Sequence, residues 1–181
     1  NSYNLNYRSI NQFTFTNIFA NASYSKRSNS IQSRANLAGI NAVRTSTNSI
    51  FPRETYNVSG RVDKRFKNFK LNAGTSFNYS DFTNVINDQT VSSNSLNQNY
   101  SASIETNFRD KPNIELGYKY NINQYDNGGF ENKFITESPF ARVDAYFGKG
   151  FVFTAEYSYN SYKNETETLN KFRFLDADLS Y

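Results

Sequence analysis

Acidic side chains are the groups in this sequence whose type and spacing come nearest to catalysis. Two pairs stand out, Glu165 with Glu167 and Asp176 with Asp178. A separation of two residues puts both carboxylates on one face of a β-strand, and general acid–base catalysis uses such pairs. Catalysis also needs a pocket and a shifted pKa, and the sequence signals neither. We interpret the first pair as part of a polar loop and the second as part of a polar wall.

Other catalytic and metal-binding residue types are missing. The chain of 181 residues contains no Cys and no His, so it lacks thiolate ligands, disulfides, and the commonest metal ligand and general base. The segment "DNGGF" from Asp126 lacks the glutamate that would complete a calcium loop. The sequence therefore predicts no enzymatic activity, no metal site and no cofactor.

Positive charge is spread along the chain. Lys and Arg number 20 against 16 Asp and Glu, giving a net charge of +4. The segment "DKRFKNFK" interleaves basic and aromatic residues, which would suit single-stranded nucleic acid. It would equally place Lys and Arg at lipid headgroups while Phe66 and Phe69 anchor in the membrane interface. Because the basic residues do not cluster, we favour headgroups and predict no nucleic-acid partner.

Period-two alternation is the main structural signal. In "PNIELGYKYNIN", every second residue from Ile114 to Ile122 is apolar or aromatic, and polar residues or glycine fill the places between. No helical periodicity competes with it, and no apolar run approaches the length of a transmembrane helix. The sequence predicts an all-β protein of about ten strands. Strand segments are expected at 2–9, 12–25, 29–43, 55–64, 69–80, 99–108, 112–123, 138–147, 150–160 and 172–181.

The predicted connections are of two kinds. Four are short and basic, at 25–29, 63–68, 109–113 and 147–151. Longer connections rich in Asn, Ser, Thr and Asp are expected at 45–55, 81–98, 126–133 and 160–170, with a compact one near 9–12. Alternation of tight turns with long loops would gather each kind at one end of an antiparallel sheet. Outer-membrane barrels have this sidedness, with short periplasmic turns and longer extracellular loops.

The apolar parity is unusually rich in tyrosine, which favours lipid over a protein core. A tyrosine in a dry core needs a partner for its hydroxyl, whereas a tyrosine at a membrane interface keeps its ring in hydrocarbon and its hydroxyl among headgroups. In the cleaner segments charged residues take the opposite parity, as expected for a barrel lumen, while Lys64 shares the apolar parity at a strand end. We predict an interface girdle near the strand ends, made of Tyr56, Tyr79, Tyr100, Tyr120, Tyr157, Tyr159 and Tyr181. The lumen-facing candidates are Arg61, Glu105, Lys119 and Glu156.

Several stretches resemble the later barrel strands of TonB-dependent-receptor-like outer-membrane proteins, which are abundant in Bacteroidota. They are "NIFANASYSKRSNSIQS", "FKLNAGTSFNYSDFTN", "GKGFVFTAEYSYNSY" and "FRFLDADLSY". The resemblance implies that residues 1–181 form a segment of an antiparallel up-and-down transmembrane β-barrel of about 22 strands. It implies uptake of a large nutrient or chelate across the bacterial outer membrane. The implied partners are outer-membrane lipid and lipopolysaccharide, TonB, and a surface lipoprotein or other subunits of an outer-membrane complex.

The resemblance leaves alternatives open. No plug or periplasmic domain is recognisable in residues 1–181, so the chain can instead be a structural or accessory barrel subunit of an insertion or secretion machine without transport of its own. A secreted β-rich adhesin is a further alternative. The chain contains no Met, so we expect a processed chain or a fragment. A complete barrel of ten strands stays open because Tyr181 ends an alternating run, as in signals read by barrel-assembly machinery.

Overall fold

The computed structural model describes residues 1–28, 31–38, 41–48, 51–87, 89–109, 111–147 and 150–181. All regular secondary structure in these ranges is β-strand, and none of it is a helix that could cross a membrane. The prediction of an all-β protein is confirmed. The eleven strands are β1 (Ser2–Asn11), β2 (Thr16–Arg27), β3 (Ile31–Ala38), β4 (Asn41–Asn48), β5 (Arg53–Phe66), β6 (Phe69–Ile86), β7 (Gln89–Thr106), β8 (Asn113–Asn127), β9 (Phe130–Phe147), β10 (Phe151–Lys163) and β11 (Thr168–Ser180).

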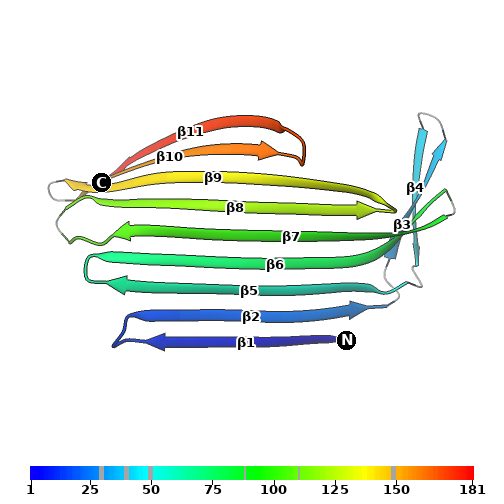
Figure 1. The fold of residues 1–181 in the computed structure, drawn as a ribbon, viewed down its shortest axis with the longest axis horizontal. Coiled ribbons are helices and arrows are strands. Elements are labelled where there is room, and N and C mark those ends of the chain that lie inside the picture. The colour runs from blue at the N-terminus through cyan, green and yellow to red at the C-terminus, as the bar shows by residue number, and fades with distance from the viewer. Residues whose placement is uncertain (29–30, 39–40, 49–50, 88, 110, 148–149) are drawn as a thin grey trace.

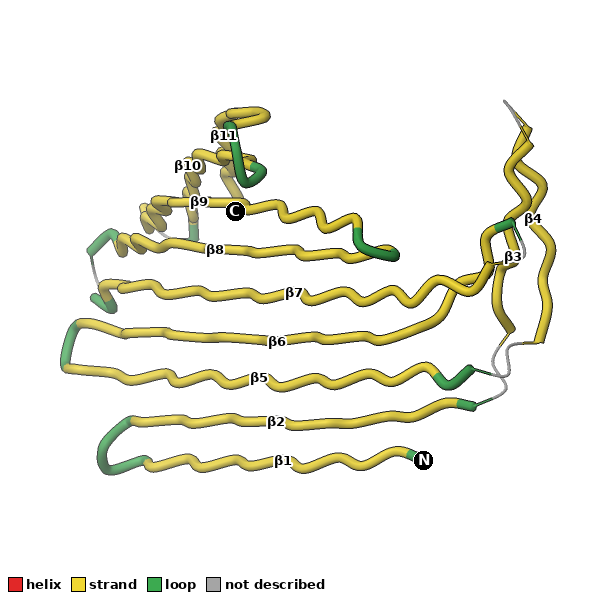
Figure 2. Tube along the Cα trace, turned by 45° about the vertical axis from the view of Figure 1, so that its right-hand side comes forward, coloured by secondary structure: helices red, strands yellow, loops and turns green. Residues whose placement is uncertain are grey.

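Nine of these strands form one antiparallel up-and-down sheet in the order β1-β2-β5-β6-β7-β8-β9-β10-β11 (Figure 1). The sheet is open, because in the described part of the chain β1 pairs only with β2 and β11 only with β10. Figure 2 shows β10 and β11 turning out of the plane in which β1 to β8 lie. The predicted up-and-down order is confirmed, while a closed ring is not seen.

The strands β3 and β4 form a hairpin that stands apart from this path. They pair with each other, and β3 also meets β6 in a short parallel contact that includes Arg34 and Val85. Figure 1 shows the hairpin at one end of the sheet, between β2 and β5 in chain order. The prediction of a single strand over residues 29–43 is therefore wrong. β3 ends at Ala38 and its antiparallel partner β4 begins at Asn41, while residues 39–40 lie outside the described residues.

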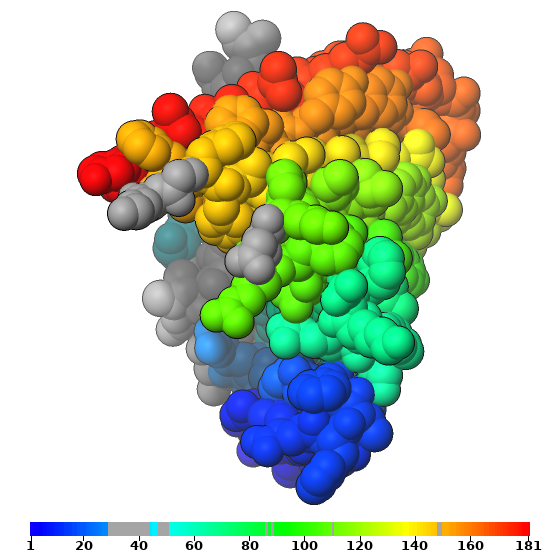
Figure 3. Space-filling model, turned by 90° about the vertical axis from the view of Figure 1, so that its left-hand side faces the viewer, coloured from blue at the N-terminus to red at the C-terminus, as the bar shows by residue number. Residues whose placement is uncertain are grey.

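The two ends of the sheet are distinct. We call one the turn end, with the connections 12–15, 67–68, 107–112 and 148–150, and the other the loop end, with 28–52, 87–88, 128–129 and 164–167. Figure 3 views the turn end, with β1 at the bottom and β11 at the top. Three of the predicted short basic connections lie at the turn end. The prediction of a short turn at 25–29 is wrong, because β2 extends to Arg27 and ends at the loop end. The compact connection predicted near 9–12, which was grouped with the long loops, belongs to the turn end.

The long loops predicted at 81–98 and 126–133 are wrong, because strands occupy most of those residues. β6 continues to Ile86 and β7 begins at Gln89, while β8 and β9 are joined through Gly128 and Gly129 alone. Both glycines have positive φ, 65° and 93°, as a type I′ hairpin turn requires. Asn and Ser side chains support the extensions through cross-strand hydrogen bonds: Asn84 Nδ2 donates to Ser93 Oγ at 3.1 Å, and that hydroxyl donates to Asn127 Oδ1 at 2.8 Å.

Candidate functional site on two opposite faces of the sheet

The strand register sorts the side chains onto an apolar face and a polar face. Residues opposite each other in an antiparallel pair point to the same side of the sheet. Starting from Tyr56, which pairs with Tyr24 and Tyr79, the register assigns the alternating apolar residues of nine strands to one face. Large apolar side chains on this face are exposed: Leu5 is 71% exposed, Leu116 54% and Leu175 76%.

These residues form a continuous stripe across the sheet, which we call the apolar band. On the loop-end side it stops at charged or other polar residues. The next position on this face toward the loop end is Glu54 beyond Tyr56 on β5, Asp81 beyond Tyr79 on β6, and Arg173 beyond Leu175 on β11. On the turn-end side it reaches the turns. Its alternating members lie at 3–7, 18–24, 56–66, 69–79, 100–106, 114–122, 139–147, 151–159 and 175–179.

The band runs obliquely to the strands. Register pairs connect Leu175 on β11 through Tyr157, Ala141, Leu116, Ile104 and Leu71 to Lys64 on β5. Its boundary therefore moves eight residues toward the turn end, from Tyr56 to the level of Lys64, over the six steps from β5 to β11. A residue advances ~3.3 Å along a strand and neighbouring strands lie ~4.8 Å apart. A shift of eight residues over six strands therefore means that the strands are tilted by about 40° from the direction perpendicular to the band.

Aromatic rings border the band on both sides. On the loop-end side the ring centroids of Tyr24 and Tyr56 lie 4.8 Å apart, those of Tyr56 and Tyr79 6.1 Å, and those of Tyr100 and Tyr120 6.3 Å. Tyr157 and Tyr159 of β10 belong to the same face. On the turn-end side the border consists of Phe66, Phe69, Phe147, Phe151 and Tyr181, and the rings of the last two lie 4.6 Å apart.

The seven tyrosines predicted as a girdle are thus divided. Six lie on the apolar face near its loop-end border, whereas Tyr181 follows β11 at the opposite border. Tyr79, Tyr100, Tyr120 and Tyr157 are not near strand ends as expected, because β6, β7, β8 and β10 continue beyond them toward the loop end.

Charges on the apolar face sit at the margins of the band, and several of them have polar partners. Beyond the loop-end border, Lys26 Nζ lies 2.6 Å from Glu54 Oε1, and the Tyr56 hydroxyl donates to Glu54 Oε2 at 3.0 Å. The hydrogen bonds from Lys26 and Tyr56 hold the pKa of Glu54 below its ordinary value. Near the turn end, Lys64 Nζ donates to the Thr14 carbonyl oxygen at 2.8 Å and the Thr16 hydroxyl at 2.9 Å.

The polar face carries two neighbouring rows of Asn and Ser, which we call the amide rows. Asn21 Nδ2 donates to Asn6 Oδ1 at 2.6 Å and to Asn4 Oδ1 at 2.9 Å, and the side chain of Asn78 donates to that of Asn57. The register places the rows across six strands. One consists of Asn6, Asn21, Ser59, Ser76, Asn99 and Asn121, and the other of Asn4, Ser23, Asn57, Asn78, Asn97 and Asn123.

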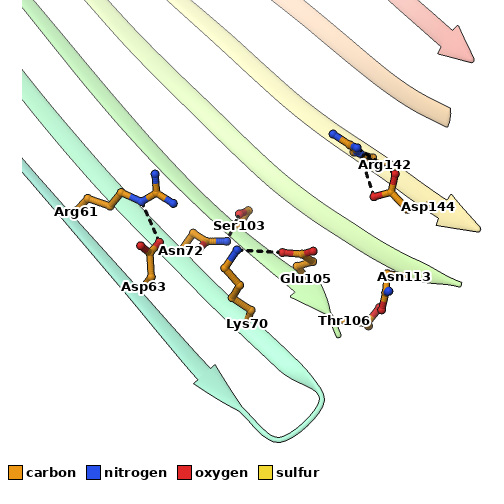
Figure 4. A network of polar contacts seen from close by, with 10 residues as sticks. All are labelled: Arg61, Asp63, Lys70, Asn72, Ser103, Glu105, Thr106, Asn113, Arg142 and Asp144. Atoms are coloured by element: carbon orange, nitrogen blue, oxygen red, sulfur yellow. Dashed lines mark hydrogen bonds and ion pairs between the residues drawn. The ribbon is translucent and has the colours of Figure 1, made fainter. Parts of the chain in front are cut away.

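A charged cluster lies on the same face, closer to the turn end. Arg61 Nε contacts Asp63 Oδ1 at 2.9 Å, Lys70 Nζ contacts Glu105 Oε2 at 3.4 Å, and Arg142 Nη2 contacts Asp144 Oδ1 at 3.0 Å (Figure 4). The cluster surrounds a hollow of about 410 Å³ whose floor includes Gly74, Ser101 and Ser103. The four predicted lumen-facing residues, Arg61, Glu105, Lys119 and Glu156, all line this hollow.

A glycine and a phenylalanine fit together beside the hollow. A Cβ built on Gly117 would meet two ring carbons of Phe140 at 2.3 Å, so the ring of Phe140 lies directly over the glycine backbone. Lys119 Nζ lies 4.9 Å from the centre of the same ring, a cation–π distance. The glycine thus allows an aromatic side chain to pack flat on a polar face.

Neither carboxylate pair forms a catalytic arrangement. Asp176 and Asp178 lie on the polar face of β11, while Glu165 and Glu167 belong to the β10–β11 connection. The Asn164 side chain organises that connection by accepting hydrogen bonds from the backbone N–H groups of Thr166 and Glu167 at 3.0 and 2.7 Å. Within the described ranges, no group of three or more His, Cys, Asp or Glu side chains is placed to hold a metal ion.

The amide rows were missed by the sequence reasoning. The signal was present in Asn21, Asn57 and Asn78. Their shared parity with other Asn and Ser residues in neighbouring strand segments would have indicated the rows. Comparison of the chain with protein families, with curated proteins and with solved structures finds no match.

Proposed function

We propose that this chain forms part of the wall of an outer-membrane β-barrel that imports a large nutrient or chelate. The apolar face would contact lipid and the polar face would line the lumen. The geometry described above supports the membrane position. The import role follows from the resemblance of the strand segments to TonB-dependent receptors.

The oblique apolar band is the observation that carries the membrane assignment. Barrel strands tilt by ~35–45° and expose an apolar band ~25 Å tall between two aromatic girdles. Here the drift of the band corresponds to a tilt of about 40°. On β5, β6, β8, β9 and β10 the band takes nine to eleven residues of strand, which project to about 22–28 Å along the membrane normal. On β1, β2, β7 and β11 it takes five to seven residues. An apolar face that packed against protein would have no need for paired aromatic borders.

The polar face supports a water-filled or cargo-filled interior. Cross-strand hydrogen bonds link the amide rows, ion pairs within and between strands link the charged cluster, and together they cover one side of the sheet from β1 to β10. Lipid could not solvate such a surface, because unsatisfied polar groups in hydrocarbon cost several kcal/mol each. The lumen is therefore the side on which Arg61, Glu105, Lys119 and Glu156 would lie.

Lipid quenching of single tryptophans tests the membrane assignment. The chain contains no Trp, so Val58→Trp on the apolar face and Ser59→Trp on the polar face can be compared against the parent protein. In vesicles of brominated phospholipid we expect strong quenching of the tryptophan at position 58 and weak quenching at position 59. Equal, weak quenching at both positions would rule out the membrane wall.

Import and scaffolding are separated by the phenotype of a strain lacking the intact protein. Import predicts loss of energy-dependent uptake of one compound from a panel of large nutrients and metal chelates, with other outer-membrane proteins assembled normally. Defective assembly or secretion of other proteins, with uptake intact, would instead favour an accessory barrel.

A further inference from the structure

The charges around the hollow on the polar face lie in two rows, one on each side of its floor. The row nearer the turn end contains both signs, in the register order Lys70, Glu105, Glu115, Arg142 and Glu156. Figure 4 shows three of them, Lys70, Glu105 and Arg142. The row nearer the loop end joins Arg61, Gly74, Ser101, Lys119 and Ser138, and both of its charged members are cations. Among the residues that line the hollow, carboxylates therefore occur on one side only.

Two of those carboxylates lack an ion-pair partner among the described residues. Glu115 and Glu156 are half-buried, and the ion pairs in the described ranges include neither of them. Glu115 also stands directly opposite Glu105, and like charges in this relation repel each other. A cationic group beside Glu115 and Glu156 would offset this repulsion.

Arg142 stands between Glu115 and Glu156 in the register, yet its charge is engaged elsewhere. Its guanidinium donates to both carboxylate oxygens of Asp144 at 3.0–3.2 Å. The Thr154 hydroxyl donates to Asp144 Oδ1 at 2.7 Å, which fixes the carboxylate that holds Arg142. The two glutamates are therefore left for a cation that the described residues do not supply.

Lys119 is the matching cation on the other side of the hollow. Its neighbours in the register are Ser101 and Ser138, and it has no ion-pair partner in the described part of the chain. Its Nζ lies 4.9 Å from the centre of the Phe140 ring, which packs over Gly117, so the ammonium leans toward the floor. Four residues of strand from Glu115 to Lys119 cover ~13 Å, so free charges of opposite sign face each other across an aromatic ring over less than that distance.

These charges select a ligand that carries both signs. A polyamine would bring cations to Lys119, a polyphosphate would bring anions to Glu115 and Glu156, and a neutral glycan would balance none of the three. A peptide carries an ammonium at its amino terminus and carboxylates on its acidic side chains. Its extended backbone advances ~3.3–3.6 Å per residue, so its first and third residues lie about 7 Å apart. That separation fits between two rows whose side chains reach toward each other.

We propose that the hollow binds the amino-terminal end of an oligopeptide. The terminal ammonium lies between Glu115 and Glu156, the second side chain contacts the Phe140 ring, and an acidic third residue pairs with Lys119. The rest of the peptide extends toward the amide rows, whose side chains can both donate to and accept from its backbone. This inference rests on the proposed function and names the class of its cargo.

Calorimetric titration of the intact protein in detergent tests the proposal with the hexapeptide Ala-Phe-Asp-Ala-Ala-Ala, amidated at its carboxyl end. Two altered peptides each lose one charge, the first by acetylation of the amino terminus and the second by replacement of its aspartate with asparagine. We expect each change to weaken binding at least about tenfold, because each removes a hydrogen bond between charged groups. Equal affinity for all three peptides would overturn the proposal, and this comparison needs no variant of the protein.

Variants of the protein assign each charge of the peptide to its partner. In Glu115→Gln/Glu156→Gln, acetylation of the peptide should no longer weaken binding, while the aspartate-to-asparagine change should still do so. In Lys119→Met the pattern should be reversed. Glu131→Gln and Lys133→Met on β9 make the same chemical changes outside the hollow, and they should leave both penalties unchanged. Penalties that persist in the hollow variants would place the peptide elsewhere and overturn the proposal.

Failure of this inference is distinguishable from failure of the proposed function. If the hexapeptide does not bind while Val58→Trp is quenched by brominated lipid, the wall assignment stands and the cargo is of another class, or a segment of the intact protein fills the hollow. Either result overturns this inference alone. Absence of the quenching overturns the proposed function and this inference together.

Discussion

At the scale of single residues, the polar face depends on matching small and large side chains across strands. Gly117 on β8 stands opposite Phe140 on β9 and Ser103 on β7. The phenylalanine ring uses the space that a side chain at position 117 would fill. This arrangement lets Phe140 cover backbone that would otherwise face the hollow, and it places the ring within reach of Lys119.

We therefore expect Gly117→Ala to destabilise the sheet. Its Cβ would meet the Phe140 ring at 2.3 Å and the Ser103 Cβ at 3.0 Å, an overpacking that costs about 1–3 kcal/mol. The free energy of urea unfolding in phospholipid vesicles measures the loss. Gly60→Ala is the control, because the nearest atom to a Cβ there is the Phe19 carbonyl oxygen at 3.9 Å. In a Phe140→Ala background the cost of Gly117→Ala should largely disappear, and an undiminished cost would contradict the account.

Alternation along the sequence is enough to assign a residue to one face of the sheet, but it does not identify the residues that it contacts on neighbouring strands. Arg61, Glu105, Lys119 and Glu156 were assigned to one face from alternation alone, and the structure places all four around one hollow. The contact of Phe140 with Gly117 depends on which residues stand opposite each other on different strands. That register is set by turn geometry and by the whole sheet, neither of which alternation within one strand encodes.

At the scale of the strands, alternation identified the segments that carry the apolar band and failed beyond it. The segments 81–86 and 89–98 are rich in Asn, Ser and Thr, so they resemble loops, yet they pair as continuations of β6 and β7. Their backbone hydrogen bonds and side-chain contacts such as Asn84 to Ser93 stabilise them without an apolar face. Hydrophobic periodicity cannot detect a strand with polar residues on both faces.

The two faces of one strand should respond differently to the same charge. Val62, near the middle of the band on β5, is replaced by arginine in one variant, and Ser59, on the polar face of β5, in another. Arginine at the lipid midplane costs about 2–4 kcal/mol, so Val62→Arg should lose that much unfolding free energy in vesicles. Ser59→Arg, facing the proposed lumen, should lose less than about 1 kcal/mol. Equal losses would mean that both faces meet the same medium.

At the scale of the whole molecule, the sheet is asymmetric along its strands. The turn end carries short connections such as 67–68, flanked by basic residues, while the loop end bears the β3–β4 hairpin and the extensions of β6 to β9 beyond the apolar band. In the proposed barrel, this difference fixes the orientation. The loop end would face the cell exterior and the turn end the periplasm, as in outer-membrane barrels with short periplasmic turns.

Surface labelling of intact cells tests this orientation. A short epitope is inserted between Gly128 and Gly129 at the loop end in one variant, and between Lys67 and Asn68 at the turn end in another. Both sites are two-residue hairpin connections, so the insertions disturb the sheet to a similar degree. We expect antibody to label the first variant on intact cells and the second only after the outer membrane is permeabilised. The reverse pattern would invert the barrel in the membrane, and labelling of both variants on intact cells would fit a secreted adhesin instead of a membrane wall.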